Sequence, residues 1–582
     1  MKIHIQEKAL ALAALSFLAI AVLHIPDHIF PHGFDKNAPV QLFSLLIVAG
    51  AYSIFIAAKS ERFRFSRIAL YGAAALVLTQ LISVAGSGNL IGSLVGDTGR
   101  YVGSLSAFGL LVISVFHTQF NFSGFIKLLR FYIVAIEIVC LAGLAQHFNL
   151  ISLPGDQGMS ATLGNIDFFA AFIGTALPLL FLLALYSSQR VKILLALAAA
   201  VDIYALRLAG PLQGYLDIAF TGVGIAIYCI RKYLPRRHMT LNARTFLGTF
   251  AIIIWAEFIF LMPFLGDKIP VLGNDVQVKI RSNFWLAGMR EFFAHPLVGV
   301  GPDQYGNNYE QYRTLEDIAK YTNILSNDAH SASVQTLATV GILGTLAFLF
   351  LLAIVVRSLI ILWDNRTVDR RALFAIGLYL FIYLSNSFVS PITLTQKYLF
   401  WAVAGFVVGQ VYRLPSRKSL NNSAKRVAPV AIASVFLLFA TLFAQAHINY
   451  LSHVEKYAKN NSAVINYTAS PLLPCFMFFD AELLMAENHG NDYSVAAAER
   501  ELAHNPRCVA AEIFLAKTAV NLNRIPALKE HIYKLVEIAP ARNDTISLGM
   551  FYANRASDLA LKAHLQREMK TLGLVYIPGK LG

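Results

Sequence analysis

Runs of about 20 mostly apolar residues recur along most of the chain, and they limit its possible folds more than any other feature. A helix needs about 20 such residues to cross the hydrocarbon core of a bilayer. A backbone in lipid has no water to bond, so segments of this kind cross as helices. The sequence therefore predicts an all-α, polytopic membrane protein of about 12–13 transmembrane helices, near residues 9–25, 40–58, 68–86, 101–117, 126–146, 168–186, 191–207, 214–231, 245–265, 333–362, 372–389, 397–412 and 428–446.

The composition agrees with lipid as the main solvent. Hydrophobic residues make up 57% of the chain and charged residues 14%, against about 25% charged in an average soluble protein. The net charge of +14 would suit a nucleic-acid-binding protein, but the cations stand in short clusters between the apolar runs. Clusters in that position set membrane orientation. We therefore expect membrane lipids around the chain and no nucleic-acid partner.

Lys and Arg divide unevenly between alternate loops. With a cytoplasmic N-terminus, the inner loops hold about five times as many cations as the short outer loops, as expected of cytoplasmic loops. No small-x-small cleavage site follows the first run, so we expect it to remain as a span. The prediction is a transmembrane core over 1–446, with a large outer loop at about 266–332, and an extracytoplasmic domain over 447–582.

The tail has a different composition, in which Glu, Lys, Asn and Ala replace the apolar runs. The stretch ELAHNP ends at Pro506 and KLVEIAP ends at Pro540, 34 residues later. That period is typical of tetratricopeptide repeats, which are helix pairs. We therefore expect a tetratricopeptide-like domain, which offers a surface to a protein partner. Cys475 and Cys508 also lie here, either as a disulfide, which an oxidising compartment allows, or as two buried thiols.

Several familiar chemistries have no motif in the chain. It contains no Gly-rich phosphate loop ending in Lys-Ser/Thr, no HExxH and no CxxC, so we expect neither ATP hydrolysis nor a metal or other cofactor. His24, His28 and His32 are spaced by four residues, but Pro26 and Pro31 argue against one helix that would align them as metal ligands. A reaction at the outer face must therefore draw its energy from a substrate that arrives already activated.

Polar residues at the ends of spans are candidate site residues, because such groups are costly in a membrane. Asn165 and Asp167 begin the run at 168–186, as a helix N-cap or as part of a site. Arg207, Gln213 and Asp217 stand around a tight hairpin between two runs. Arg207 is the cation nearest to Asp217 in sequence. The two predict either a structural ion pair or a substrate site.

The expected outer loop holds the other candidates. Phe284, Trp285, Met289, Phe292 and Phe293 recur at helical spacing, which predicts an amphipathic helix at the membrane interface.

Arg281 and Arg290 stand at the polar edge of that helix, where they meet lipid phosphates or a substrate. His330 precedes the run at 333–362, and its ordinary pKa near neutrality suits either a general base or an interfacial side chain. Asp328 either orients that imidazole or caps a helix.

Four stretches resemble, in this order, the O-antigen ligase and O-antigen polymerase superfamily, which also includes bacterial protein O-oligosaccharyltransferases. LGNIDFFAAFIGTALPLL is similar to that family's Gly-Asn-led span. RSNFWLAGMREFFAHPLVGVGPDQYG resembles its Arg…Trp…Pro-Leu-x-Gly-Val-Gly pattern, and AHSASVQTLATVGILG its His…Gln-x-Leu…Gly-x-x-Gly pattern. The hairpin stretch DIYALRLAGPLQGYLDIA is the fourth. The similarity covers about residues 100–412.

The resemblance implies transfer of a glycan from a polyprenyl-pyrophosphate carrier to an acceptor hydroxyl, at the outer face of a bacterial inner membrane, without nucleotide or metal. By position, His330 corresponds to the family's catalytic His and Arg281 to its phosphate-binding Arg. Asn165 and Asp328 lie within the matching stretches.

The chain also departs from the family pattern. The family often has Ser-Arg-Gly in the hairpin, whereas GPLQG here places Gln213 there, so Arg207 or Arg290 is the substitute we expect for the second phosphate contact. Asp167 and Ser331 stand where the family often has Asn.

Other functions remain open at this stage. Ligase, polymerase and protein O-oligosaccharyltransferase would share the same core, and the acceptor would be a lipid, a glycan or a protein. Two other classes are a lipid-glycan flippase or transporter, which would show inverted repeats or broken spans, and a non-catalytic scaffold that docks partners on its helical tail.

Overall fold

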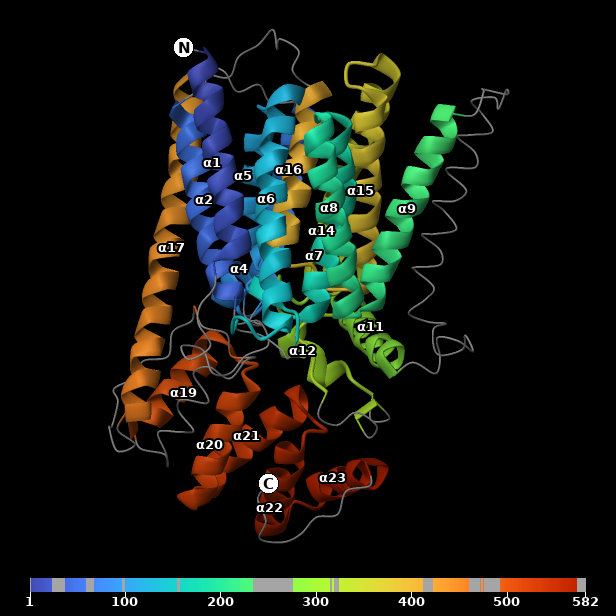
Figure 1. Ribbon diagram of the computed structural model, residues 1–582. Helices are drawn as coiled ribbons and strands as arrows, with labels where there is room; N and C mark the ends of the chain where they lie inside the picture. Colours follow the sequence, from blue (N-terminus) through green and yellow to red (C-terminus); the bar gives the residue numbers. More distant parts are fainter. Residues whose placement is uncertain are drawn as a thin grey trace. The chain divides into compact units, whose positions relative to one another are not determined.

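The computed structural model describes residues 2–23, 37–58, 67–96, 100–153, 158–233, 276–314, 317–318, 324–411, 422–459, 472, 475 and 492–572. Over these residues the chain is all-helical and has no strand (Figure 1). It divides into two compact units, each made of three separate stretches. The first unit comprises 1–75, 106–266 and 348–438, and the second 76–105, 267–347 and 439–582.

The first unit is built from long apolar helices. Its main members are α1 (Lys2–Val22), α2 (Ala38–Ala58), α5 (Ser104–His117), α6 (Phe122–His147), the short 3-10 helix η2 (Ala161–Leu163), α7 (Ile166–Leu185), α8 (Gln189–Ala209), α9 (Leu212–Tyr233), α15 (Arg370–Val389) and α16 (Leu394–Val411). Four of the described helices have residues in both units: α5, whose first two residues belong to the second unit, and α3 (Arg67–Gly86), α14 (Ala332–Asn365) and α17 (Asn422–Lys459).

Eight helices of the described residues are long and apolar enough to cross a membrane, which indicates a multi-pass membrane protein. They are Ala38–Ala58, Ile68–Gly86, Phe122–His147, Ile166–Leu185, Leu212–Ile230, Ala332–Asn365, Arg370–Val389 and Val427–Tyr450. Four more of the predicted runs coincide with the helices α1, α5, α8 and α16. The predicted run at 245–265 lies outside the described residues.

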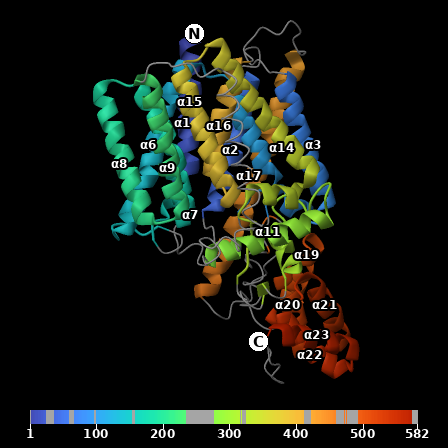
Figure 2. The same ribbon diagram turned by 90° about the vertical axis from the view of Figure 1, so that its right-hand side faces the viewer.

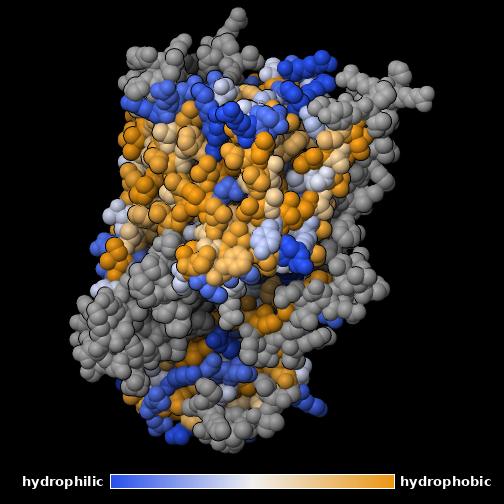
Figure 3. Space-filling model, in the orientation of Figure 1, coloured by the Kyte–Doolittle hydropathy of each residue, from blue (hydrophilic) through white to orange (hydrophobic). Residues whose placement is uncertain are grey.

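Helix α7 forms the centre of the first unit. Its most apolar window is 83% buried, and α6, α8, α9 and α15 pack around it. A helix that is hydrophobic on all sides is expected in such a place. The helices around it expose large apolar side chains, among them Phe131, Leu141 and Leu194. Figure 3 shows hydrophobic side chains over the visible surface of the long helices, as expected where helices face lipid.

The second unit consists of residues 76–105, residues 267–347 and the C-terminal part of the chain from residue 439. Its helices are α4 (Leu90–Val95), α11 (Val276–Ala294), α12 (Tyr305–Tyr312), α19 (Asp492–His504), α20 (Val509–Asn521), α21 (Ile525–Ile538), α22 (Asn543–Ala556) and α23 (Leu559–Leu572). Helices α20 to α23 pack in sequence as one group (Figure 2). Apolar residues including Leu528, Leu548 and Leu565 form their shared core.

A backbone pairing fixes the segment after α11 against the first part of α14. The amide of Val300 donates to the Ala338 carbonyl at 2.9 Å, and the amide of Ile342 donates to the Pro296 carbonyl at 2.9 Å. Helix α14 is interrupted at Gly341, where φ is 62°. A Cβ added at Gly299 would lie 2.3 Å from the Thr339 backbone carbon. Only glycine allows the two backbones to approach so closely.

We expect Gly299→Ala to destabilise the protein by more than about 1 kcal/mol, because φ at this position is +70° and the added Cβ would meet backbone. The thermal denaturation midpoint of the purified protein measures the effect. Gly222→Ala is the control, since a Cβ there meets nothing within 4 Å. Equal midpoints for the two variants would show that the pairing tolerates a side chain.

Candidate functional site

The loop from Ser326 to His330 places an imidazole directly before α14. His330 adopts φ +54°, a left-handed conformation that is uncommon for a residue other than glycine. The conformation is held by its neighbour: the Asp328 carboxylate oxygen Oδ1 accepts the His330 backbone N–H at 2.7 Å. The Gln335 side chain accepts the Ala329 backbone N–H at 2.8 Å. Asp328 therefore positions His330 through its side chain.

The same loop determines the tautomer of the imidazole. Nδ1 of His330 lies 2.9 Å from the backbone carbonyl oxygen of Asp328. A carbonyl oxygen can only accept, so Nδ1 carries the proton and donates it. The other nitrogen, Nε2, then holds a lone pair. Among the described residues no hydrogen bond occupies Nε2. The arrangement is that of a neutral histidine able to take up a proton at Nε2.

The surroundings keep this imidazole neutral. Its pKa falls from 6.5 to about 4, mainly because burial disfavours the charged form, and further because of the positive charge of Arg100. Asp328 opposes these effects, and Arg281 adds to the lowering. At pH 7 His330 is therefore an uncharged base with cations close by.

Arg281, on helix α11, is near enough to this loop for its charge to lower the pKa of His330. It lies one helical turn before Phe284, on the same face of the helix, and the Phe284 ring centroid is 5.0 Å from that of His330. Phe284 and Trp285 belong to a buried cluster with Tyr305 of α12 and Val334 of α14. Part of the predicted amphipathic face thus forms protein core. The structure brings together Arg281, Asp328 and His330.

Arg100 contacts the loop of His330, although the sequence did not single it out as a candidate. Its Nε donates to Oδ1 of Asn327 at 2.8 Å, three residues before His330. In the sequence it is a single cation in the short loop before the apolar run at 101–117, a position usually explained by a side chain that reaches the membrane interface. The one feature of the sequence that prompts a search for a further cation is the hairpin stretch GPLQG, which lacks the arginine of the family that it resembles.

Arg290 stands apart from Arg281 on the same helix. Nine residues are two and a half turns at 3.6 residues per turn, so the two side chains leave opposite faces of α11. Arg290 is exposed, and its Nη1 donates to the Tyr312 carbonyl at 3.1 Å. It therefore braces the end of α12.

The remaining predicted residues belong to the first unit. Asn165 caps α7, where its side chain accepts the Asp167 backbone N–H at 2.7 Å. Gln213 donates to the Asp167 carbonyl at 2.5 Å. Asn165 thus closes the start of α7, and Gln213 joins it to the start of α9.

Of the two alternatives for Arg207 and Asp217, the structural ion pair is wrong. Arg207 is exposed and its Nη1 donates to the Tyr215 hydroxyl at 3.2 Å. Asp217 is fully buried, and its Oδ2 accepts from Asn386 of α15 at 2.8 Å. The nearest cation in sequence is not the nearest polar partner, because α9 turns its buried face towards α15.

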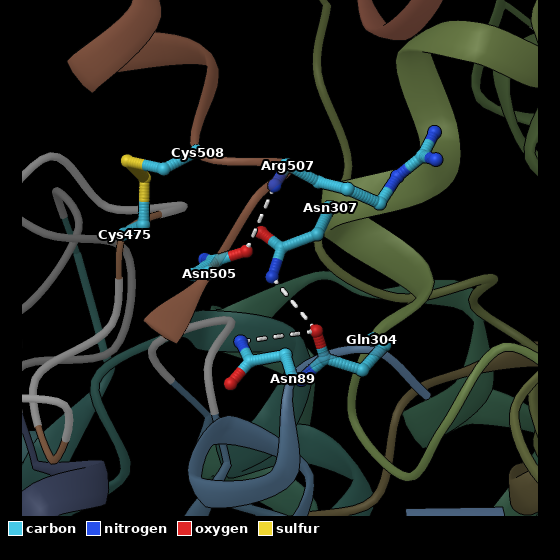
Figure 4. Close-up of a disulfide and its surroundings, with 7 residues drawn as sticks. All are labelled: Asn89, Gln304, Asn307, Cys475, Asn505, Arg507 and Cys508. Atoms are coloured by element: carbon cyan, nitrogen blue, oxygen red, sulfur yellow. Dashed lines mark hydrogen bonds between the residues drawn. A yellow bond between two sulfur atoms is a disulfide. The ribbon is translucent and has the colours of Figure 1, made fainter. Parts of the chain in front are cut away.

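Within the second unit, the tail contacts helix α12 and the segment after it. Cys475 and Cys508 form a disulfide (Figure 4), which decides between the two alternatives for these residues. Arg507, beside the disulfide, donates to the side chain of Gln311 on α12.

A cavity of about 240 Å³ lies between the tail and the segment after α12. Its lining includes Arg313, Leu325 and Arg542, and Arg542 pairs with Glu310 at 3.0 Å. Neither Arg281 nor His330 is among its lining residues.

The histidines at 24, 28 and 32 lie outside the described residues. Compared with known proteins, the chain matches no family model and no curated protein.

The lowered pKa of His330 makes the folded state sensitive to acid. Between pH 6.5 and about 4 the unfolded chain binds a proton at this residue that the folded chain does not, so stability falls as the pH falls through this window. We expect His330→Asn to lose less thermal stability than the wild type between pH 7.5 and pH 5. The other histidines contribute equally to the pH dependence of stability in both proteins. Parallel pH dependences would contradict a depressed pKa at His330.

Proposed function

We propose that the protein is an integral-membrane glycosyltransferase of the O-antigen ligase kind. It moves a glycan from a polyprenyl-pyrophosphate carrier to an acceptor hydroxyl. The observation that carries the proposal is the neutral imidazole of His330, with its Nε2 lone pair available, beside Arg281 and at the start of a membrane-spanning helix. A base beside a phosphate-binding group is what such a transfer needs.

The step is a direct displacement that inverts the anomeric carbon. The acceptor oxygen attacks that carbon while His330 Nε2 takes the hydroxyl proton. The bond between the anomeric carbon and the pyrophosphate oxygen breaks, and its electron pair leaves with the diphosphate. Arg281 stabilises the departing charge, because a guanidinium stays charged and binds phosphate through two parallel N–H groups. His330 then releases its proton to solvent.

The proposed setting is a bacterial inner membrane, with the N-terminus in the cytoplasm and the site and tail outside it. The 34-residue offset between the start of α20 at Val509 and of α22 at Asn543 supports a tetratricopeptide-like tail, on which a protein partner could dock.

Polymerase and protein O-oligosaccharyltransferase remain alternatives with the same chemistry. A flippase or transporter and a non-catalytic scaffold are the competing classes. A scaffold would have no need of the tautomer that the Asp328 carbonyl imposes on His330.

We expect His330→Asn to lower the transfer rate by roughly 10²–10⁴-fold, the usual worth of a general base. Asn tolerates the left-handed backbone at this position, so the variant should express and fold. The measurement is reconstitution in vesicles with a lipid-pyrophosphate glycan and candidate acceptors, with product size read on a gel. One addition indicates a ligase or protein transferase, and a ladder indicates a polymerase.

The matched control is His295→Asn, an exposed histidine on the segment after α11, which should keep wild-type turnover. Wild-type turnover in His330→Asn would remove His330 from the mechanism. Glycan that crosses the bilayer without forming a new bond would instead indicate a flippase.

A further inference from the structure

The proposed transfer needs more positive charge than one arginine supplies. A diphosphate gains negative charge as its bond to the sugar breaks, and several cations usually share that charge. The hairpin between α8 and α9 offers no arginine at GPLQG, and Arg207 at the end of α8 bonds Tyr215. Within the second unit, a different segment of the chain brings a guanidinium to the catalytic loop.

We propose that Arg100, from the segment between α4 and α5, is the second cation that binds the donor's diphosphate and stabilises it as it leaves. The inference rests on the proposed function and names a residue of that same site. It is carried by the bond from Arg100 Nε to Asn327 Oδ1 at 2.8 Å, which ties the guanidinium to the loop of His330.

That bond orients a planar group. A guanidinium presents five N–H donors in a rigid fork, and fixing Nε fixes the plane in which the Nη groups lie. Arg100 is partly exposed, so a ligand can reach it. A guanidinium of fixed orientation near the His330 imidazole suits bidentate binding of phosphate oxygens.

The backbone at Arg100 is fixed by the packing of the next residue, Tyr101. Tyr101 is fully buried with φ +54°. Its hydroxyl lies 3.0 Å from Nε2 of His447, and its ring meets that of Phe443 edge-on at 5.1 Å. Both partners belong to α17. Because Tyr101 is packed in this way, Arg100 starts from a fixed backbone position.

Arg281 approaches the same loop from α11, on the face that presents Phe284 to the imidazole. The two cations therefore come from segments about 180 residues apart and converge on one histidine. Their charges both lower the pKa of His330, and that of Arg100 has the larger effect. This convergence is expected of an anion site beside a base.

A purely structural reading is that Arg100 only holds Asn327 in place. The two readings predict different activities when the charge of Arg100 and its hydrogen bond to Asn327 are removed in separate variants. Arg100→Gln removes the charge, Arg100→Lys keeps the charge without the fork, and Asn327→Ala removes the bond to Arg100 but keeps the guanidinium. Arg555→Gln is the matched control, because Arg555 donates to the Asn523 side chain at 2.9 Å in the tail.

Steady-state kinetics with a lipid-pyrophosphate glycan in vesicles give the main test. We expect Arg100→Gln to lower kcat/KM for the donor by about 10²-fold, the usual loss of one preorganised donor to developing charge. The acid limb of its pH–rate profile should move to higher pH, since a cation beside His330 is gone. Arg100→Lys should lose less and keep the acid limb. Asn327→Ala should also keep it, and Arg555→Gln should match the wild type.

Two results would overturn the assignment. One is an Arg100→Gln variant as active as Arg555→Gln. The other is an Asn327→Ala variant with the same loss as Arg100→Gln and the same acid limb in both, which would show a structural role alone.

Binding of inorganic pyrophosphate to the purified protein, followed by calorimetry, separates this outcome from failure of the proposed function. If the wild-type protein forms no product, the proposed function is wrong. Pyrophosphate binding that Arg100→Gln weakens and Arg555→Gln leaves intact would still support the site.

Discussion

The hydrogen bond from Nδ1–H of His330 to the Asp328 carbonyl is the interaction on which the site depends. It fixes the tautomer, and it leaves the lone pair on Nε2. The bond exists only because the backbone at His330 is left-handed, a strained conformation that surrounding contacts must hold. The Asp328 carboxylate and Gln335 supply those contacts from either side.

The loop in turn depends on how α11 is fastened to α14. The pairing of residues 296–301 with 338–343 replaces helix hydrogen bonds that α14 gives up around Gly341. An interrupted helix is costly in lipid unless the freed backbone groups find partners. Here the segment after α11 supplies them, so one set of bonds both satisfies α14 and sets the position of Arg281 and Phe284 against His330.

The sequence predicted what periodicity and local chemistry control. Apolar runs gave the long helices, since each run of about 20 residues has one stable form in lipid. The roles of His330 and Arg281 stay predictions from their motifs. Pairings across distant segments were not predictable in this way. Asp217 bonds Asn386 rather than Arg207, and Arg100 meets Asn327 across more than 200 residues, because such contacts depend on which helix faces meet.

The two arginines proposed to bind the leaving group also affect the basicity of the His330 imidazole. Burial, and then the charges of Arg100 and Arg281, disfavour an imidazolium, so His330 stays neutral and able to accept a proton. A bound diphosphate would neutralise much of that positive charge and raise the basicity of Nε2. The donor would therefore strengthen the base as it arrives. Proton removal from the acceptor hydroxyl would then be favoured only when a leaving group is present, which links the two halves of the displacement through charge alone.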